Sequence, residues 1–89
     1  DNEKVNEFRG KWNKFFKNEN EIYLEIGCGS GNFTVQNAQK FPDRNYIALE
    51  LRFKRLVLGA KKATKRNLKN ILFLMLNCLN IIKKKQYII

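Results

Sequence analysis

Residues Tyr23 to Phe33 read YLEIGCGSGNF, in which an apolar run leads directly into a turn with three glycines. Gly27, Gly29 and Gly31 alternate with small residues, and the segment that follows them suits a helix. A strand, a glycine-rich turn and a helix in that order let a ligand approach the backbone closely and meet a helix N-terminus. The stretch therefore predicts a ligand-binding loop that follows a first strand.

The spacing of these glycines is GxGxG. In the dinucleotide-binding form, GxGxxG, the third glycine would fall at position 32, where this chain has Asn32. Glycine turns after strands are frequent in α/β proteins, so the spacing alone does not name the ligand.

Glu25 lies two positions before the first glycine of the loop and narrows the choice of ligand. A carboxylate beside a pyrophosphate is repulsive, by about 4 kcal/mol for unit charges 4 Å apart at an effective dielectric constant of 20. The same carboxylate attracts a cation. S-adenosyl-L-methionine carries an ammonium and a sulfonium and no phosphate, so Glu25 favours that cofactor. The alternative is an inward-facing acid that pairs with a lysine.

Strand-like and helix-like segments alternate along the rest of the chain, which is the pattern of the first half of a doubly wound α/β sheet. We therefore predict an incomplete Rossmann-like α/β fold with three parallel strands and intervening helices. The expected elements are a strand over 22–26, a helix over 32–40, a strand over 46–50, a basic helix over 53–67 and a strand over 70–76.

One partial domain is expected. Its first strand is central in such a sheet, so it should pair with a later strand that the sequence does not contain, and the exposed edge would favour self-association. The predicted parts are an N-terminal helical segment (1–20), a cofactor-binding half (21–82) and a basic and apolar tail (83–89).

One valine and four aromatic side chains recur at helical spacing near the N-terminus and predict an amphipathic helix. We expect these aromatic residues to pack against the domain rather than to stack on nucleic-acid bases. The residues concerned are Val5, Phe8, Trp12, Phe15 and Phe16.

Two further polar residues end predicted strands. Glu50 follows Gly31 by 19 positions, where α/β nucleotide sites place the acid that accepts both ribose hydroxyls. NAD-binding domains use the same device, so Glu50 supports an adenosine without choosing the cofactor. Asn77 ends the third strand at the same rim, where its amide suits either the adenine edge or the capping of a strand end.

Positive charge is concentrated in the second half of the chain. The sequence has 18 Lys and Arg against 8 Asp and Glu, and residues 51–89 contain 11 basic and no acidic side chains. A block of one sign favours a polyanionic partner, and a solvated lysine surface is the alternative. The candidate RNA-binding residues on the basic helix are Lys54, Arg55, Lys61, Lys62, Lys65 and Arg66, whereas the run from Lys83 to Lys85 is interpreted as a solvated tail.

Cysteine and hydropathy patterns exclude several other classes. Cys28 and Cys78 form no CxxC pair, and the chain has no histidine, so neither a zinc site nor a disulfide framework is indicated. The apolar stretch from Ile71 is interrupted by Asn77 and Asn80, short of the roughly 20 residues that a membrane span needs. No signal-peptide pattern opens the chain. We expect a cytoplasmic protein with no metal and no membrane partner.

Four segments together resemble the amino-terminal half of the tRNA (guanine-N7)-methyltransferase family, a class I S-adenosylmethionine-dependent group. They are WNKFFKNE, LEIGCGSGNF, NYIALELR and LKNILFLMLNCLN, and the resemblance covers about residues 12 to 80. It implies an incomplete class I methyltransferase fold, S-adenosylmethionine as cofactor, tRNA as partner, and methyl transfer to N7 of a guanine.

The resemblance also implies roles for individual residues. Glu25 and the loop would contact the methionine part of the cofactor, Glu50 its ribose, and Asn77 with Cys78 would lie next to the adenine, where the family usually has Asp followed by Ala. The full implied set is Glu25, Gly27, Cys28, Gly29, Gly31, Glu50, Leu51, Asn77 and Cys78.

The family's aspartate–proline–tryptophan segment, with its catalytic aspartate, falls beyond Ile89 in this resemblance, so the catalytic residue is unknown. Two other functions remain open from the sequence. One is a non-catalytic remnant that binds RNA or cofactor, and the other is half of an NAD-type oxidoreductase domain.

Overall fold

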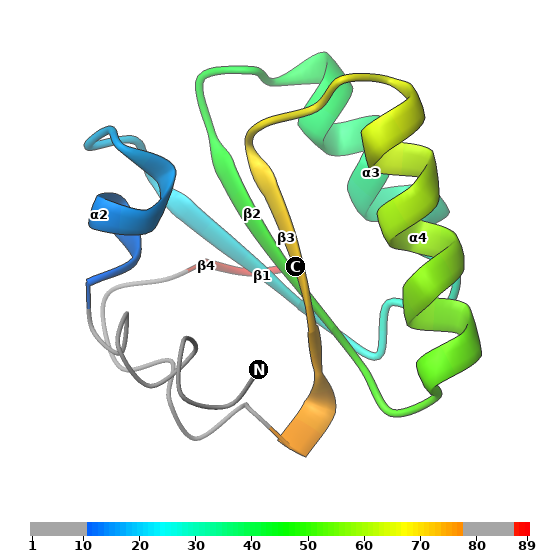
Figure 1. Ribbon diagram of the computed structural model, residues 1–89. Helices are drawn as coiled ribbons and strands as arrows, with labels where there is room; N and C mark the ends of the chain where they lie inside the picture. The colour runs from blue at the N-terminus through cyan, green and yellow to red at the C-terminus, as the bar shows by residue number, and fades with distance from the viewer. Residues whose placement is uncertain (1–10, 78–86) are drawn as a thin grey trace.

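The computed structural model describes residues 11–77 and 87–89, which form a parallel sheet with helices on both faces. Figure 1 shows two long helices side by side on one face of the sheet and a short helix on the other. Within these described residues, no helix is long and apolar enough to cross a membrane.

The sheet has the order β3-β2-β1-β4, and all of its strand pairs are parallel. Its strands are β1 (Ile22–Ile26), β2 (Asn45–Glu50), β3 (Ile71–Met75) and β4 (Tyr87–Ile88). The first three confirm the predicted parallel strands with bounds within one residue of those expected. Their carboxyl ends meet at one rim, which is where ligands bind in sheets of this kind.

Helices α3 (Asn32–Lys40) and α4 (Phe53–Lys65) connect these strands on the same face, because parallel crossovers are right-handed. α3 has the predicted bounds. α4 ends two residues earlier than predicted, since Asn67 adopts a left-handed conformation (φ 56°) that stops the helix.

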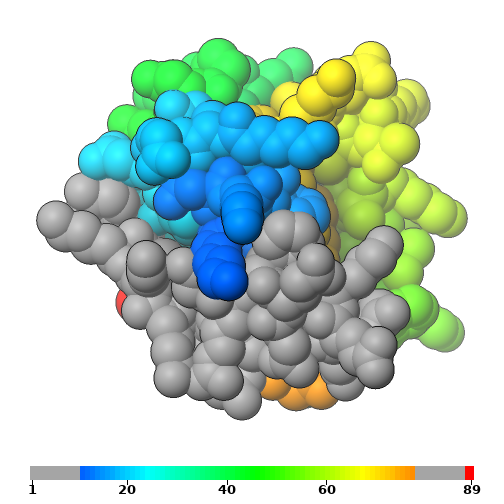
Figure 2. Space-filling model, turned by 60° about the vertical axis from the view of Figure 1, so that its left-hand side comes forward, coloured from blue at the N-terminus to red at the C-terminus, as the bar shows by residue number. Residues whose placement is uncertain are grey.

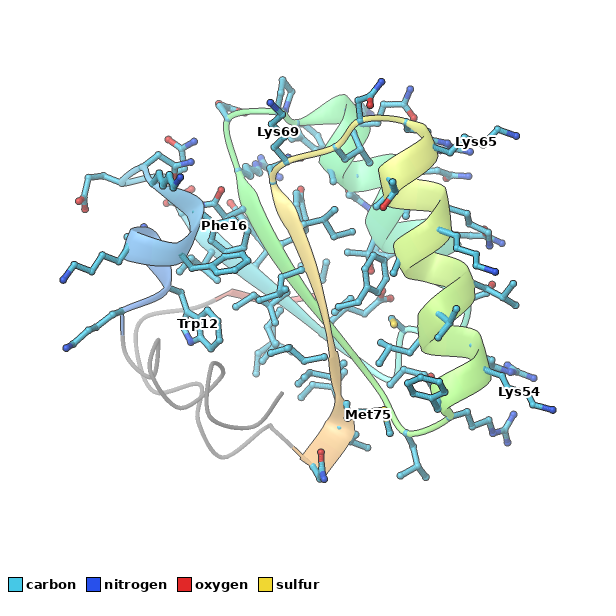
Figure 3. All side chains as sticks on the ribbon, in the orientation of Figure 1. Trp12, Phe16, Lys54, Lys65, Lys69 and Met75 are labelled. Atoms are coloured by element: carbon cyan, nitrogen blue, oxygen red, sulfur yellow. The ribbon has the colours of Figure 1, made fainter. Side chains whose placement is uncertain are left out.

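The opposite face of the sheet carries the main apolar core. The short helix α2 (Trp12–Phe16) lies there, and Figure 3 shows Trp12 and Phe16 pointing toward the sheet. Trp12 is 2% exposed and packs with Leu24 and Leu49, so the predicted packing role of this residue and of Phe16 is confirmed. Phe15 is exposed, and Val5 and Phe8 lie outside the described residues. In the space-filling view the blue atoms of α2 lie near the centre of the visible face, and α4 reaches the right-hand edge (Figure 2).

On the helical face, two glycines allow close approach between the helices and β3. A Cβ added to Gly31 would lie 2.7 Å from Cε1 of Phe73, and one added to Gly59 would lie 2.6 Å from the same atom. Such distances are too short for real contacts, so the ring of Phe73 fits between α3 and α4 only because both positions are glycine.

The short strand β4 corrects the expectation that the first strand would lack its second neighbour. Tyr87 and Ile88 pair with Tyr23 and Leu24 of β1, and the N–H of Ile89 donates to the carbonyl of Leu24 at 2.9 Å. The hydrogen bonds between paired strands join backbone groups only. A short segment at the end of the tail can therefore pair with β1. The division of the chain into segments 1–20, 21–82 and 83–89 stays a prediction.

Candidate ligand-binding site at the glycine loop

The loop after β1 depends on its glycines for its shape. Gly27, Gly29 and Gly31 have φ angles of 77°, 59° and 79°. Residues with a Cβ rarely adopt such angles, so each position favours glycine for conformational reasons. Gly31 is the N-cap of α3, and its carbonyl accepts a hydrogen bond from the N–H of Val35 at 2.8 Å. The turn thus leads directly into the helix N-terminus, as predicted.

The first part of the loop is held against the end of β2. The N–H groups of Gly27 and Cys28 both donate to the carbonyl of Leu49, at 2.8 and 2.9 Å. The N–H of Gly29 donates to Oε1 of Glu50 at 2.7 Å. Three consecutive amides are therefore fixed by two residues of the neighbouring strand.

Glu50 is only 7% exposed, and its carboxylate is oriented by backbone groups. Its second oxygen, Oε2, accepts from the N–H of Arg52 at 2.8 Å. The N–H groups of Arg52 and then Gly29 lower the pKa of this carboxyl group, so it is ionised at neutral pH. The N–H of Leu51 also contributes to the lowered pKa, and a carboxylate has about four acceptor sites, so Glu50 can still accept a hydrogen bond from a ligand hydroxyl. The bond to Gly29 is a structural role that the sequence did not reveal.

Glu25 is half-buried, and its side chain accepts a hydrogen bond from Oγ1 of Thr34 in the first turn of α3. Within residues 11–77 and 87–89 it pairs with no lysine or arginine, so the alternative of a lysine-paired acid finds no support in this part of the chain. Thr34 is fully buried and was not among the predicted site residues. Its one sequence signal is a hydroxyl three residues after the last glycine of the loop.

Cys28 lies near both carboxylates. Burial, followed by the negative charges of Glu25 and Glu50, raises the pKa of its thiol from an ordinary value of 9.0 to about 11. The thiol is therefore neutral at physiological pH. Two carboxylates around a neutral thiol favour a cationic group in this part of the site. The described part of the chain contains no cluster of three or more side chains suited to a metal ion.

The space beside the loop is open. A Cβ added to Gly27 would meet no atom within 4 Å, and the neighbouring Ile26 is 43% exposed. Leu51, directly after Glu50, is 67% exposed. Asn77 is exposed and follows Met75 by two residues. Because Met75 pairs with Glu50, Asn77 lies near the same rim of the sheet. Cys78, which was also predicted to bind the cofactor, lies outside the described residues.

Five of the six candidate RNA-binding residues are exposed on or next to α4. They are Lys54, Arg55, Lys61, Lys65 and Arg66. Figure 3 shows Lys54 and Lys65 near opposite ends of α4, both directed away from the sheet. The sixth, Lys62, is half-buried, and its ammonium donates to the carbonyl of Ser30 at 3.1 Å and to Oδ1 of Asn32 at 2.5 Å.

A parallel sheet of this order, with a glycine loop after its first strand and an acid at the end of its second, is typical of α/β domains that bind nucleoside-containing ligands. Residues 19–87 match the family described as "Putative methyltransferase", and the chain belongs to that family.

Two curated relatives agree with this assignment. A bifunctional glycosyltransferase/methyltransferase of Fusobacterium nucleatum is 54% identical over 74 residues, which are 83% of this chain and 12% of that protein. A tRNA (guanine-N(7)-)-methyltransferase of Clostridium acetobutylicum is 42% identical over 65 residues, which are 73% of this chain and 31% of that protein. The chain therefore spans less than a third of either relative, and its predicted resemblance to the guanine-N7 family is confirmed.

Solved structures confirm the fold. PKMT2 from Rickettsia typhi, in complex with AdoHcy, is similar to this chain with a TM-score of 0.65 and 24% sequence identity. The similarity covers 76% of this chain and 14% of that chain. The predicted class I methyltransferase fold, present here in part, is thus the observed one.

Proposed function

We propose that this chain is the cofactor-binding part of an S-adenosylmethionine-dependent methyltransferase that acts on N7 of a guanine in tRNA. The observation that carries the proposal is the pair of carboxylates, Glu25 and Glu50, at a GxGxG loop. The identity of 42% with a tRNA (guanine-N(7)-)-methyltransferase supports the substrate.

The residues at the rim fit this cofactor. Glu25, which no described cation neutralises, suits the ammonium of the methionine part. Glu50 offers acceptors for the ribose hydroxyls, and the open side of Gly27 permits close approach to the backbone. We assign the adenine to the exposed part of the rim beside Leu51 and Asn77.

When bound, the cofactor supplies a methyl group on a sulfonium, whose sulfur leaves with the bonding electron pair. N7 of neutral guanine carries no proton that must be removed, so the protein has to position and desolvate the reactants rather than act as a general base. A chain without histidine is compatible with that requirement. Protonated Cys28 adds no third negative charge to the site.

The exposed basic residues of α4 are assigned to tRNA phosphates. Contacts of this kind contribute salt-dependent affinity and fix position without reading sequence. Guanine itself would be selected through its N7 and O6 edge by hydrogen-bond donors.

The test is an assay with this chain, unmodified tRNA and S-adenosylmethionine labelled in its methyl group. After nuclease digestion, labelled 7-methylguanosine would show the proposed reaction directly and reject the alternative, a non-catalytic remnant. Binding of S-adenosylhomocysteine and tRNA with no label in the RNA is the result expected both of a cofactor-binding part alone and of such a remnant. If S-adenosylhomocysteine does not bind to the chain, the proposal is rejected, and binding of tRNA alone would then support an RNA-binding remnant.

A further inference from the structure

We propose that Lys62 is a positioning residue that holds the far end of the glycine loop in the shape that cofactor binding requires. This inference rests on the proposed function. Lys62 belongs to α4, whereas its two acceptors lie at the end of the loop and at the start of α3. They are the carbonyl of Ser30, at 3.1 Å, and Oδ1 of Asn32, at 2.5 Å.

The two ends of the loop are fixed in different ways. The first part is attached to β2 through the carbonyl of Leu49 and the carboxylate of Glu50. At the far end, the N–H of Gly31 donates back to the carbonyl of Cys28 at 3.0 Å, which is a bond within the loop itself. The ammonium of Lys62 connects that end to a separate element. Hydrogen bonds from a charged donor are stronger than those between neutral groups, so this connection is a firm one.

The electrostatics of the helix do not explain this contact. A cation at a helix N-terminus is unfavourable, because that end carries partial positive charge. Lys62 nevertheless places its ammonium at the first residue of α3, and the side chain is half-buried there. The hydrogen bonds to the carbonyl of Ser30 and to the side-chain oxygen of Asn32 therefore have to offset the unfavourable interaction between the ammonium and the positive end of the helix. The contact thus depends on these two acceptors.

A second residue of α4 approaches the loop. A Cβ added to Gly29 would lie 3.9 Å from Nη1 of Arg55, so the guanidinium of Arg55 lies beside that glycine. α4 thus adjoins the loop near its middle and binds it at its end. Helix α4, which carries the proposed RNA surface, therefore also supports the glycine loop. Lys62 contributes to the support of the loop.

The experiment compares three variants of the 89-residue chain. Lys62→Met keeps the aliphatic stem and removes the donors, Lys62→Arg keeps a cationic donor, and Lys69→Met removes an equal charge from an exposed position on the loop between α4 and β3. The first readout is the Kd for S-adenosylhomocysteine by calorimetry. We expect an increase of about tenfold for Lys62→Met and less than about threefold for the other two.

The second readout needs no ligand. Amide hydrogen exchange, followed by NMR, reports local opening of the loop. We expect the N–H of Gly31 to exchange about tenfold faster in Lys62→Met than in Lys69→Met, while the amides of β2 keep their rates. A double-mutant cycle with Asn32→Ala should be non-additive, because Asn32 and Lys62 share one contact.

Equal Kd values for Lys62→Met and Lys69→Met would overturn the inference, and so would equal exchange rates at Gly31. If the unmodified chain binds no S-adenosylhomocysteine, the proposed function fails. The exchange rates then still decide whether Lys62 fixes the loop.

Discussion

Gly59 lies in the middle of α4, where the absence of a side chain makes room for the ring of Phe73. Overpacking of this kind costs about 1–3 kcal/mol, and the higher helix propensity of alanine offsets up to about 1 kcal/mol. We therefore expect Gly59→Ala to lower the free energy of unfolding by roughly 1 kcal/mol, measured by urea denaturation. Thr64→Ala, at an exposed position of the same helix, should change it little. A Gly59→Ala chain more stable than the original would show that the ring is not confined.

The thiol of Cys28 provides a prediction about pH. Because its pKa is raised to about 11, the thiolate fraction at pH 8 should be about a hundredfold lower than for an ordinary cysteine. Alkylation by iodoacetamide, followed by mass spectrometry in a Cys78→Ser chain, should be correspondingly slow. Glu25→Gln should accelerate it, because one of the two negative charges is removed. Rapid alkylation of the folded chain at pH 8 would contradict this description of the site.

The same raised pKa has a consequence for stability. The folded state holds the thiol proton more tightly than the unfolded state does. The contribution of the protonated thiol to the free energy of unfolding is therefore fully present below about pH 9. It is lost as the pH rises from 9 toward 11. Comparison with Cys28→Ala over this pH range isolates the effect of the thiol.

At the level of single residues, the sequence predicted that Glu25 and Glu50 lie at the glycine loop, because their positions relative to the glycines are fixed along the chain, while their roles toward a cofactor stay predictions. It did not predict Thr34, since nothing in a linear pattern says that its hydroxyl reaches a carboxylate nine positions earlier. Lys62 was grouped with the candidate RNA-binding residues for a similar reason. Its neighbour Lys61 is exposed. Only the orientation of α4 relative to the loop directs Lys62, and not Lys61, toward Ser30.

Among the elements, the end of α3 and the turn after it are bound by the side chain of a single asparagine. Nδ2 of Asn70, just before β3, lies 2.9 Å from the carbonyl of Ala38, 3.2 Å from that of Phe41 and 2.9 Å from that of Arg44. This side chain joins the end of α3 and the following turn to the start of β3. Composition alone did not distinguish it from the other asparagines of the chain.

We expect Asn70→Ala to lower the free energy of unfolding by about 1–3 kcal/mol, because the carbonyls of Ala38 and Arg44 lose the amide of Asn70 as a donor, while that of Phe41 keeps the N–H of Arg44. Urea denaturation measures the change. The control is Asn37→Ala, which removes an amide whose bond to the carbonyl of Phe33 is solvent-exposed. Equal effects of the two substitutions would show that Asn70 has no special role at this junction.

Helix α4 is the element on which the proposed RNA surface depends. Reversing two exposed charges, in Lys61→Glu with Lys65→Glu, should weaken tRNA binding at least about tenfold at 0.1 M salt and reduce the salt dependence of the affinity. Fluorescence anisotropy with labelled tRNA measures both quantities.

The matched control reverses Lys11 and Lys14, which are also exposed but lie at α2 on the other face of the sheet. An equal loss in both double variants would show that net charge, rather than the α4 surface, governs binding.

Element boundaries were largely predictable because the chain carries clear stop signals. The glycine loop ends β1, and Pro42 follows the end of α3. The end of α4 was misplaced because Asn67 is left-handed, so that the N–H of Leu68 donates to the carbonyl of Ala63 at 3.0 Å and terminates the helix.

For the whole molecule, the sheet order β3-β2-β1-β4 places the glycine loop beside the end of β2. The pattern of strands predicted that arrangement, but it did not predict β4. Two residues after a lysine-rich run are too short a signal for a strand, and only their position against β1 reveals the pairing. The covering of part of that edge weakens the argument for self-association.

The net charge of the chain and the charge of the acidic residues at the glycine loop have opposite signs. The chain has a formal net charge of +10, yet the charged side chains that raise the pKa of the loop's thiol, Glu25 and Glu50, are both acidic. A dinucleotide would bring its phosphates toward Glu25, whereas a sulfonium and an ammonium would be attracted by that carboxylate. Arg55 and Lys62 approach the middle and the far end of the loop, so the choice of ligand rests on the carboxylate of Glu25 below its first glycine rather than on the net charge of the protein.

Calorimetric titration of this chain with S-adenosylhomocysteine, and separately with NADH under the same conditions, tests that claim most directly. The account predicts binding of S-adenosylhomocysteine and no detectable heat with NADH. It also predicts a loss of at least about tenfold in affinity for S-adenosylhomocysteine in Glu50→Gln, with Glu19→Gln unchanged as the exposed acidic control. Binding of NADH without binding of S-adenosylhomocysteine would contradict it.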